Sequence, residues 1–345
     1  MLKKLFAGLL AVVVLVAGAG FVAWKQFNAY MAQPLSLSEP VQFSVARGTS
    51  FGAMTSQLEA AGLINQPIYF RLHAKLNKLQ GKIKAGEYQF DSGVTPEDLL
   101  NSIVRGDTVK YYFTIVEGSN FRQLKASLLK NDILKQDIND LSNDDLLQRL
   151  GVNQQHPEGL FLAETYQIER GMSALSLLKR ANRSLMQELE KGWQEKAAKL
   201  PYKSSYQALT MASIVEKETG VASERPRIAG VFVRRLNLGM RLQTDPTVIY
   251  GMGEAYKGNI TRKDLRKPTA YNTYVIKGLP PTPIAMVGRE AINAALHPEM
   301  GKWLYFVAKG DGSHQFSTNL RDHNNAVRKY QLKRRKDYRS SPEKK

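Results

Sequence analysis

An uncharged run of twenty residues, Leu5–Trp24, most constrains this chain, because it is long enough to cross a bilayer as a helix. Lys3 and Lys4 precede the run on its short side, which the positive-inside rule places in the cytoplasm. We therefore expect residues 1–27 to form a cytoplasmic tip and a single-pass anchor in the inner membrane, with the rest of the chain periplasmic. The alternative is a cleaved signal peptide, because Ala17-Gly18-Ala19 resembles a cleavage site.

The composition narrows the class of partner. The 345 residues carry 49 basic and 31 acidic side chains, a formal charge of +18, which favours polyanionic partners. Export argues against nucleic acid, and a bacterial envelope offers another polyanion, the peptide-bearing glycan of the wall. The sequence contains no cysteine, which excludes disulfides and thiol catalysis. Its five histidines lack metal-ligand spacing, so we expect no metal and no other cofactor.

A repeat follows the polar segment 28–40, which we expect to be a linker. FSVARGTSFGAMTSQLEAAGLI (43–64) aligns without gaps with FTIVEGSNFRQLKASLLKNDIL (113–134). The aligned pairs include Phe43/Phe113, Val45/Ile115, Gly48/Gly118, Phe51/Phe121, Leu58/Leu128 and Ile64/Leu134. Each copy predicts a short strand, a glycine turn and a helix. Two ordinary β-turn-α units would give the same pattern.

The first copy resembles LysM, the small βααβ module that binds N-acetylglucosamine polymers. The resemblance covers 41–90, including a predicted strand over 86–90, and a helix opened by a Thr95–Asp98 capping box follows it. We expect an α+β fold, in which the membrane helix precedes LysM-like small α/β modules and a mixed α+β catalytic domain. The expected boundaries are 41–110 for the glycan-binding module, 111–332 for the catalytic domain, 111–150 for a second LysM-like half-repeat within it, and 333–345 for a basic disordered tail.

Periodicity predicts the elements of the catalytic domain. Helices are expected over 124–150, 174–200, 204–219, 227–236, 288–296 and 326–332, a buried strand over 303–308, and a loop-rich stretch over 239–283.

Two glutamates lie at the end of the helix expected over 204–219, in the segment ASIVEKETG. A helix turns about 100° per residue, so Glu216 and Glu218 point some 200° apart and cannot work as a pair on one face. Glu218 falls inside the apolar arc of this helix, whereas Glu216 falls at its margin and Lys217 points to solvent. Burial and the negative end of the helix dipole both favour a protonated Glu218, the condition for a general acid near neutral pH. The alternative is a structural ion pair of Glu218 with an arginine: Arg225, Arg234 or Arg241.

Polar, aromatic and turn-rich loops follow this helix. They supply hydroxyls, amides and flat rings, the groups that grip a sugar by hydrogen bonding and stacking. The candidate substrate contacts are Glu216, Gln243, Asp245, Thr247, Tyr271, Asn272 and Tyr274. The prolines of Gly278-Leu-Pro-Pro-Thr-Pro283 would hold a cleft in one shape.

Seven segments, in order, resemble the YceG-like family, the endolytic murein transglycosylases. They are ASIVEKET, RLQTDPTVIYG, YNTY, GLPPTPI, AINAALHP, LYFVAKGDGSHQFS and HNNAV. The chain departs from the family pattern at two places: E-G-L-F-L-A-E-T-Y (158–166) replaces E-G-x-x-F-P-D-T-Y, and Val287-Gly288 replaces Pro-Gly. The resemblance implies that the second glutamate of the E-K-E triplet, Glu218, is the catalytic residue.

The resemblance also implies a reaction. Glu218 would protonate the bond between N-acetylmuramic acid and N-acetylglucosamine, and its carboxylate would then take the proton of the muramoyl C6 hydroxyl to give a 1,6-anhydro end. Cleavage within nascent strands near the membrane would terminate glycan elongation, with peptidoglycan synthases as candidate partners. Two non-enzymatic alternatives stay open: a membrane-tethered peptidoglycan-binding protein, and a structural subunit of the elongation machinery.

Overall fold

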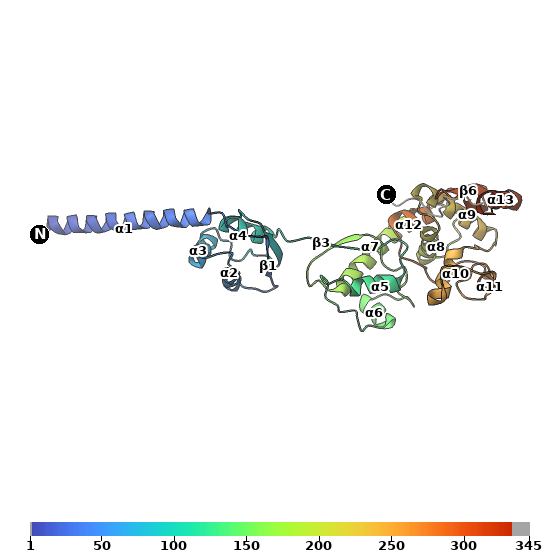
Figure 1. Cartoon of the computed structure of the whole chain (residues 1–345), viewed down its shortest axis with the longest axis horizontal. Coiled ribbons are helices and arrows are strands. Elements are labelled where there is room, and N and C mark those ends of the chain that lie inside the picture. Colours follow the sequence, from blue (N-terminus) through green and yellow to red (C-terminus); the bar gives the residue numbers. More distant parts are fainter. Residues whose placement is uncertain (1, 333–345) are drawn as a thin grey trace. The chain divides into compact units, whose positions relative to one another are not determined.

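The computed structural model describes residues 2–332. It divides into two compact units, Met1–Tyr111 (unit 1) and Tyr112–Lys345 (unit 2) (Figure 1). Helices and short two-stranded sheets occur in both parts of the chain, which confirms the expected mixed α+β class. The tail 333–345 lies outside the described residues.

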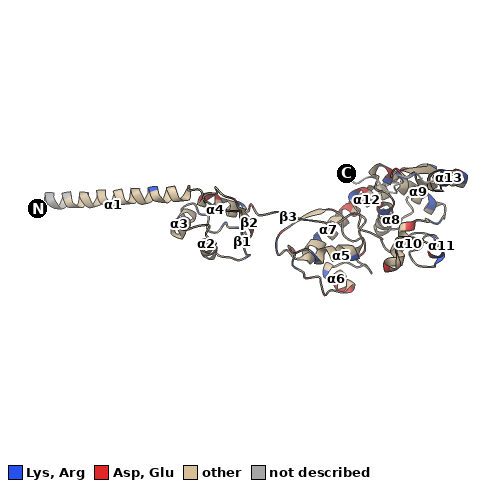
Figure 2. Cartoon of the chain, viewed as in Figure 1, with Lys and Arg blue, Asp and Glu red and all other residues tan. Residues whose placement is uncertain are grey.

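The first helix, α1 (Leu2–Met31), contains the apolar run. Its segment Gly8–Met31 is long and apolar enough to cross a membrane, a property that a signal sequence shares. From Gly8 to Gln26 its side chains are exposed, and Figure 2 shows no acidic residue on this part of the helix. An exposed apolar surface of this length requires an apolar environment to cover it.

The end of α1 belongs to the core of unit 1. Phe27 and Met31 are 4% and 2% exposed, because they pack among the apolar residues of that core. The helix therefore continues through the first four residues of the segment 28–40 that we expected to be a linker. Leu35 and Leu37 pack against the same core, so this part of the segment is held to unit 1 rather than acting as a free spacer.

Unit 1 continues with two strands and three helices: β1 (Val41–Val45), α2 (Phe51–Ala60), α3 (Pro67–Leu76), β2 (Gly86–Phe90) and α4 (Pro96–Arg105). The strands pair antiparallel. The first four elements have the order expected of a LysM-like module. The resemblance itself and glycan binding stay predictions, because an element order does not identify a ligand.

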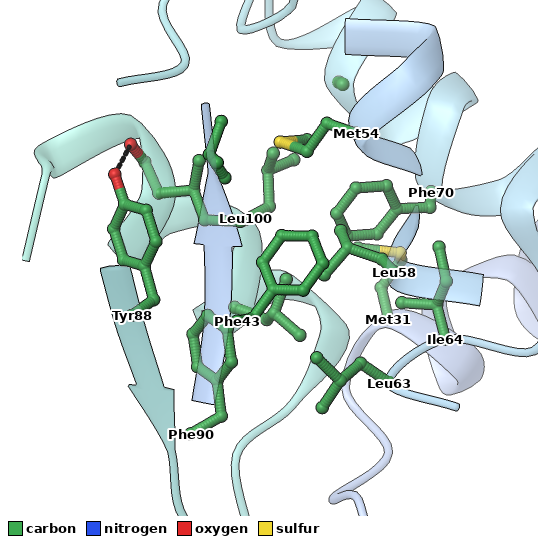
Figure 3. Close-up of a cluster of buried hydrophobic side chains, with 14 of the residues drawn as sticks. Met31, Phe43, Met54, Leu58, Leu63, Ile64, Phe70, Tyr88, Phe90 and Leu100 are labelled. Carbon is green, nitrogen blue, oxygen red and sulfur yellow. Dashed lines mark hydrogen bonds between the residues drawn. The ribbon is translucent and has the colours of Figure 1, made fainter. Parts of the chain in front are cut away.

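The core of unit 1 lies between the two strands and the helices (Figure 3). Phe43 of β1 is in register with Tyr88 of β2, and both side chains are buried. The Tyr88 hydroxyl donates to the Lys84 carbonyl oxygen at 2.7 Å, so the one polar atom of this side chain is satisfied. Helix α4 begins with the capping box predicted for Thr95 and Asp98.

The chain enters unit 2 through β3 (Tyr111–Thr114), α5 (Phe121–Leu129), α6 (Asn143–Leu150) and β4 (Thr165–Ile168), and β3 pairs with β4. A single helix over 124–150 is therefore wrong. The Asn131 side chain accepts the backbone amides of Ile133 and Leu134, both at 3.0 Å, and so competes with continuation of the helix.

Helix α8 (Ser205–Glu218) is the centre of unit 2. It contacts α7 (Ala174–Gln194), α9 (Arg225–Asn237), α10 (Asp245–Met252) and α12 (Arg289–Leu296). Every residue from Ala208 to Glu216 is buried, because neighbours surround the helix. Helix α7 ends six residues before its expected end at 200.

Shorter elements complete unit 2: η1 (Ala222–Glu224), η2 (Gly253–Ala255), α11 (Arg262–Arg266), β5 (Tyr305–Ala308), β6 (His314–Ser317), α13 (Leu320–Val327) and the π-helical η3 (Arg328–Leu332). The segment 239–283 thus contains two α-helices as well as loops. Strand β5 starts at Tyr305 and buries only Val307, so the strand expected over 303–308 is shorter and more exposed than predicted. The closing helix begins at Leu320 rather than at 326, because Asn319 caps it by accepting the Asp322 amide at 2.9 Å.

Candidate active site

Glu218 is the last residue of α8, and the chain turns into extended backbone at Thr219. Its carboxylate accepts a short hydrogen bond from the Thr244 hydroxyl. Burial raises the pKa of Glu218 to about 7; the Thr244 hydroxyl acts in the opposite direction, and the nearby charge of Asp245 adds to the rise. The side chain keeps part of its surface exposed. This carboxyl can therefore hold a proton near neutral pH while remaining reachable from solvent.

Glu216 lies in a different environment. Its side chain is 2% exposed and accepts hydrogen bonds from the Arg225 guanidinium at 2.9 Å and from the Gly288 amide at 3.0 Å. Burial raises the pKa of Glu216, and these two donors act against the rise. The placement of Glu216 at the margin of the apolar arc is therefore wrong, because a single-arc wheel does not apply to a helix that is covered on all sides.

The three arginines proposed as structural partners of Glu218 form hydrogen bonds with other groups. Arg225 pairs with Glu216, Arg234 donates to the Gly301 carbonyl at 3.3 Å, and Arg241 donates to the Tyr274 carbonyl at 3.2 Å. Arg235 is close enough to lower the pKa of Glu218, although its own hydrogen bonds go to backbone carbonyls. Within residues 2–332, none of the three proposed arginines forms an ion pair with Glu218.

The predicted loops meet beside α8. The Gln243 amide donates to the Thr273 carbonyl at 3.1 Å, and the Tyr274 hydroxyl donates to Asp245 at 2.6 Å. These bonds join the two loops that follow the acid in the sequence. Gln243 has a φ of 53°, a left-handed conformation that is uncommon outside glycine and marks a tightly specified turn next to Thr244.

The proline-rich loop joins the same assembly. The Tyr271 hydroxyl and the Thr282 hydroxyl lie 2.9 Å apart, and the Ile284 amide donates to the Ser213 hydroxyl of α8 at 2.9 Å. Hydrogen bonds thus join segments that are dozens of residues apart in the sequence around the end of α8.

The predicted substrate contacts divide into two groups. Gln243 and Asp245 are exposed, and Tyr271 and Tyr274 are partly exposed, so their side chains remain available to a ligand. Thr247 and Asn272, with Glu216, are buried and already bonded.

Asn272 and Thr247 donate hydrogen bonds to backbone carbonyls of the loop-rich segment. Asn272 donates to the carbonyls of Asp264, Leu265 and Lys267, and Thr247 donates to the Thr244 carbonyl at 2.8 Å. Contact with a substrate would require these side chains to leave buried hydrogen bonds, so they hold the loops.

A second buried carboxyl, Glu158, was not among the predicted site residues. It is 2% exposed, and its oxygens accept the Phe121 amide at the start of α5, at 2.9 and 3.1 Å. Burial raises the pKa of Glu158 to about 7. Gly159 follows it with a φ of 72°, where an added Cβ would collide with Pro283. The sequence clue was the Glu-Gly pair that opens the motif 158–166.

Glu158 lines a cavity of about 700 Å³ together with Lys125 of α5, Tyr250 of α10 and Tyr271 of the following loop. A second cavity, of about 440 Å³, shares Tyr250 and is also lined by Lys217 and Pro246. Glu218 lines neither, but Pro246 directly follows Asp245, which influences the acid. Both volumes lie in the range of small-ligand sites.

Among residues 2–332, no group of three or more His, Cys, Asp or Glu side chains is placed to hold a metal ion.

Known proteins share this architecture. The model of the YceG-like family matches residues 43–329. The endolytic murein transglycosylase of Bacillus subtilis is 30% identical over 323 residues, covering 86% of this chain and 88% of the relative. That of Streptococcus pneumoniae D39 is 28% identical and is covered over 58% of its length. The crystal structure of a YceG-like protein from Listeria monocytogenes aligns with a TM-score of 0.51 at 30% identity, over 84% of this chain and 99% of that one. This chain therefore belongs to the YceG-like family.

Proposed function

We propose that this chain is a membrane-anchored lytic transglycosylase that cleaves nascent peptidoglycan strands between N-acetylmuramic acid and N-acetylglucosamine, and so terminates elongation. One observation carries the proposal: burial raises the pKa of Glu218 to about 7, the neutral hydroxyl of Thr244 donates to its carboxylate, and the residue stays partly exposed. The names of the relatives, endolytic murein transglycosylases, supply the substrate class.

The reaction needs one proton carrier. Protonated Glu218 gives its proton to the glycosidic oxygen as the bond from that oxygen to the muramoyl C1 breaks. The muramoyl C6 hydroxyl attacks C1, and its proton passes to the Glu218 carboxylate. The product is a 1,6-anhydro end, no water is consumed, and the acid is restored in its starting state.

The charge of Asp245 raises the pKa of Glu218. The role of this second carboxylate therefore decides between a lyase and a hydrolase. A hydrolase uses a second carboxylate as base or nucleophile. The Tyr274 hydroxyl donates to Asp245 at 2.6 Å, which occupies one of its carboxylate oxygens and fixes the direction of the side chain. We therefore assign Asp245, with Gln243, Tyr271 and Tyr274, to holding the sugar.

The membrane anchor and unit 1 complete the proposal. The exposed apolar part of α1 would keep the protein where strands are made. Unit 1, with its βααβ order, would position the glycan. The non-catalytic alternative is a tethered peptidoglycan-binding protein in which unit 1 has the main role.

The test is an analysis of chain ends. Purified uncrosslinked glycan strands are digested with the full-length protein and with Glu218→Gln, and the fragments are identified by mass spectrometry. Anhydro-muramoyl ends that form with the wild type and not with the variant support the proposal. New reducing ends would make the protein a hydrolase and turn attention to Asp245, and no new ends would favour the binding protein.

A further inference from the structure

Helix α3 presents an apolar stripe on the surface of unit 1. Ile68, Leu72 and Leu76 are 74%, 40% and 55% exposed. They are four residues apart, so they lie on one face of the helix. The other face buries Phe70 and Ala74 in the core. The core therefore does not require the three exposed side chains, and something else must account for them.

Contacts fix α3 beside the end of α1. The ring of Tyr69 lies 5.9 Å from that of Phe27 and 5.7 Å from that of Tyr30, and the ring of His73 lies 6.1 Å from that of Phe27. Trp24, the last residue of the uncharged run, precedes Phe27 by about 4.5 Å along the helix axis. Helix α3 thus lies within one or two helical turns of the level at which the apolar run ends.

That level corresponds to the headgroup layer if α1 crosses a bilayer. The headgroup region adds roughly 5–8 Å on each side of the hydrocarbon core. An element packed against residues 27–30 would therefore sit at or just above the lipid headgroups. The stripe would meet the boundary between headgroups and acyl chains, where apolar side chains of surface helices are accommodated.

The charges of α3 fit the same environment. Arg71 and Lys75 are exposed and follow the stripe on the side of the helix away from Tyr69. Helix α3 contains no acidic residue. A helix with an apolar stripe, a basic edge and no carboxylate is suited to anionic phospholipid.

We propose that α3 lies on the outer surface of the membrane, with Ile68, Leu72 and Leu76 among the lipids and Arg71 and Lys75 among their phosphates. The proposal rests on the membrane anchor proposed above for α1. It gives unit 1 two attachments to the bilayer, one through α1 and one through α3. Two attachments fix the tilt of unit 1, which a single spanning helix would leave free.

The absence of cysteine makes a direct test possible, because single cysteines can be labelled without background. Three variants of the full-length protein are made: Leu72→Cys in the stripe, Ala46→Cys at an exposed position after β1, and Val16→Cys in the exposed part of α1. Each is labelled with a nitroxide and reconstituted into vesicles of phosphatidylethanolamine and phosphatidylglycerol. Electron paramagnetic resonance then compares the accessibility of each label to oxygen with its accessibility to a water-soluble nickel chelate.

We expect position 16 to be the most oxygen-accessible, position 72 to be intermediate, and position 46 to favour nickel. A label at position 72 that behaves like the one at position 46, while position 16 is immersed, would overturn the α3 proposal and leave the anchor intact. Dipolar broadening between labels at position 72 would mean that a second copy covers the stripe, and would also overturn it. A nickel-accessible label at position 16 would overturn the anchor, and the α3 proposal with it.

Discussion

Glu216 and Glu218 lie two residues apart at the end of α8, yet they face different surroundings. Glu216 has a guanidinium and a backbone amide as donors and a side chain that is 2% exposed. Glu218 has one neutral hydroxyl and a partly exposed surface. Burial raises the pKa of both, so burial alone does not distinguish them. The partners do: a fixed cation keeps a carboxylate in place, whereas a hydroxyl allows it to exchange a proton.

Substituting each glutamate should separate the two roles most strongly. Glu218→Gln keeps the shape but cannot transfer a proton, so formation of anhydro ends should fall by about 10²–10⁴. Glu216→Gln should retain most of the rate per folded molecule and lose stability instead, because Arg225 would lose its buried anionic partner. The measurement is anhydro-muramoyl yield per unit time, with thermal unfolding as the folding control. A Glu216→Gln protein that is folded but inactive would reverse the two assignments.

Removing Arg225, the partner of Glu216, should lower the stability of the fold. Arg225 joins Glu216, Glu117 and Glu290, and its own side chain is 9% exposed. Arg225→Met leaves Glu216 buried without a counter-charge, which should lower the free energy of unfolding by about 3–5 kcal/mol.

A surface ion pair in the same unit provides the control. Arg122 and its partner Glu254 are 61% and 83% exposed, so Arg122→Met should cost less than about 1 kcal/mol. Urea titrations of both variants decide the comparison. Equal losses would mean that the Arg225 cluster contributes no more than an ordinary surface pair.

Glu158 should make stability depend on pH. Its folded pKa of about 7 lies above its ordinary value, so the folded protein binds this proton more tightly than the unfolded chain. The resulting stabilisation is complete below about pH 4.5 and is lost as the pH rises through about 7. Glu158→Gln can still accept the Phe121 amide and should reduce the difference in unfolding free energy between pH 5 and pH 8 by about 1–3 kcal/mol. Urea titrations at the two pH values test this, and an unchanged difference would contradict it.

Replacing Thr244 should have the smallest effect of these substitutions, a shift in the pKa of Glu218. Its hydroxyl donates to the Glu218 carboxylate and so lowers the pKa of this group. Thr244→Val should raise that pKa by about 0.4–1 unit, because the hydroxyl binds the charged carboxylate more strongly than the protonated carboxyl, by about the energy of one ordinary hydrogen bond. Since the protonated form is the acid, the decline of the rate at high pH should move upward. A pH profile of initial rates at low substrate concentration checks this, and a downward shift would show that Thr244 stabilises the protonated form.

Sequence patterns predicted local structure well where neighbours in the chain determine it. The helix expected over 204–219 occupies 205–218, and the Thr95–Asp98 capping box is present, because both depend on residues a few positions apart. The prediction of a single helix over 124–150 is wrong, because the apolar spacing continues through the turn that Asn131 forms. Periodicity reports apolar spacing but not a side chain that binds its own backbone.

Sequence patterns could not predict hydrogen-bond partners that lie far apart in the chain. Glu158 binds an amide 37 residues earlier in the chain, and Glu216 binds one 72 residues later. Asn272 looked like a sugar ligand because the sequence cannot show that three carbonyls already occupy its amide. Glu218 was singled out by its place on the helix and by the resemblance of its motif, and its catalytic role stays a prediction; its partner Thr244, 26 residues later, could not be foreseen.

The most direct test of the central claim is whether water enters the product. The wild-type protein is incubated with purified glycan strands in ¹⁸O-labelled water, and the new ends are analysed by mass spectrometry. If Glu218 alone carries the proton and the C6 hydroxyl attacks C1, the ends will be anhydro-muramoyl and free of ¹⁸O. New reducing ends that carry ¹⁸O, in excess of those in an enzyme-free control that accounts for exchange of the anomeric oxygen, would show that water attacks C1, and would contradict a mechanism with a single carboxyl.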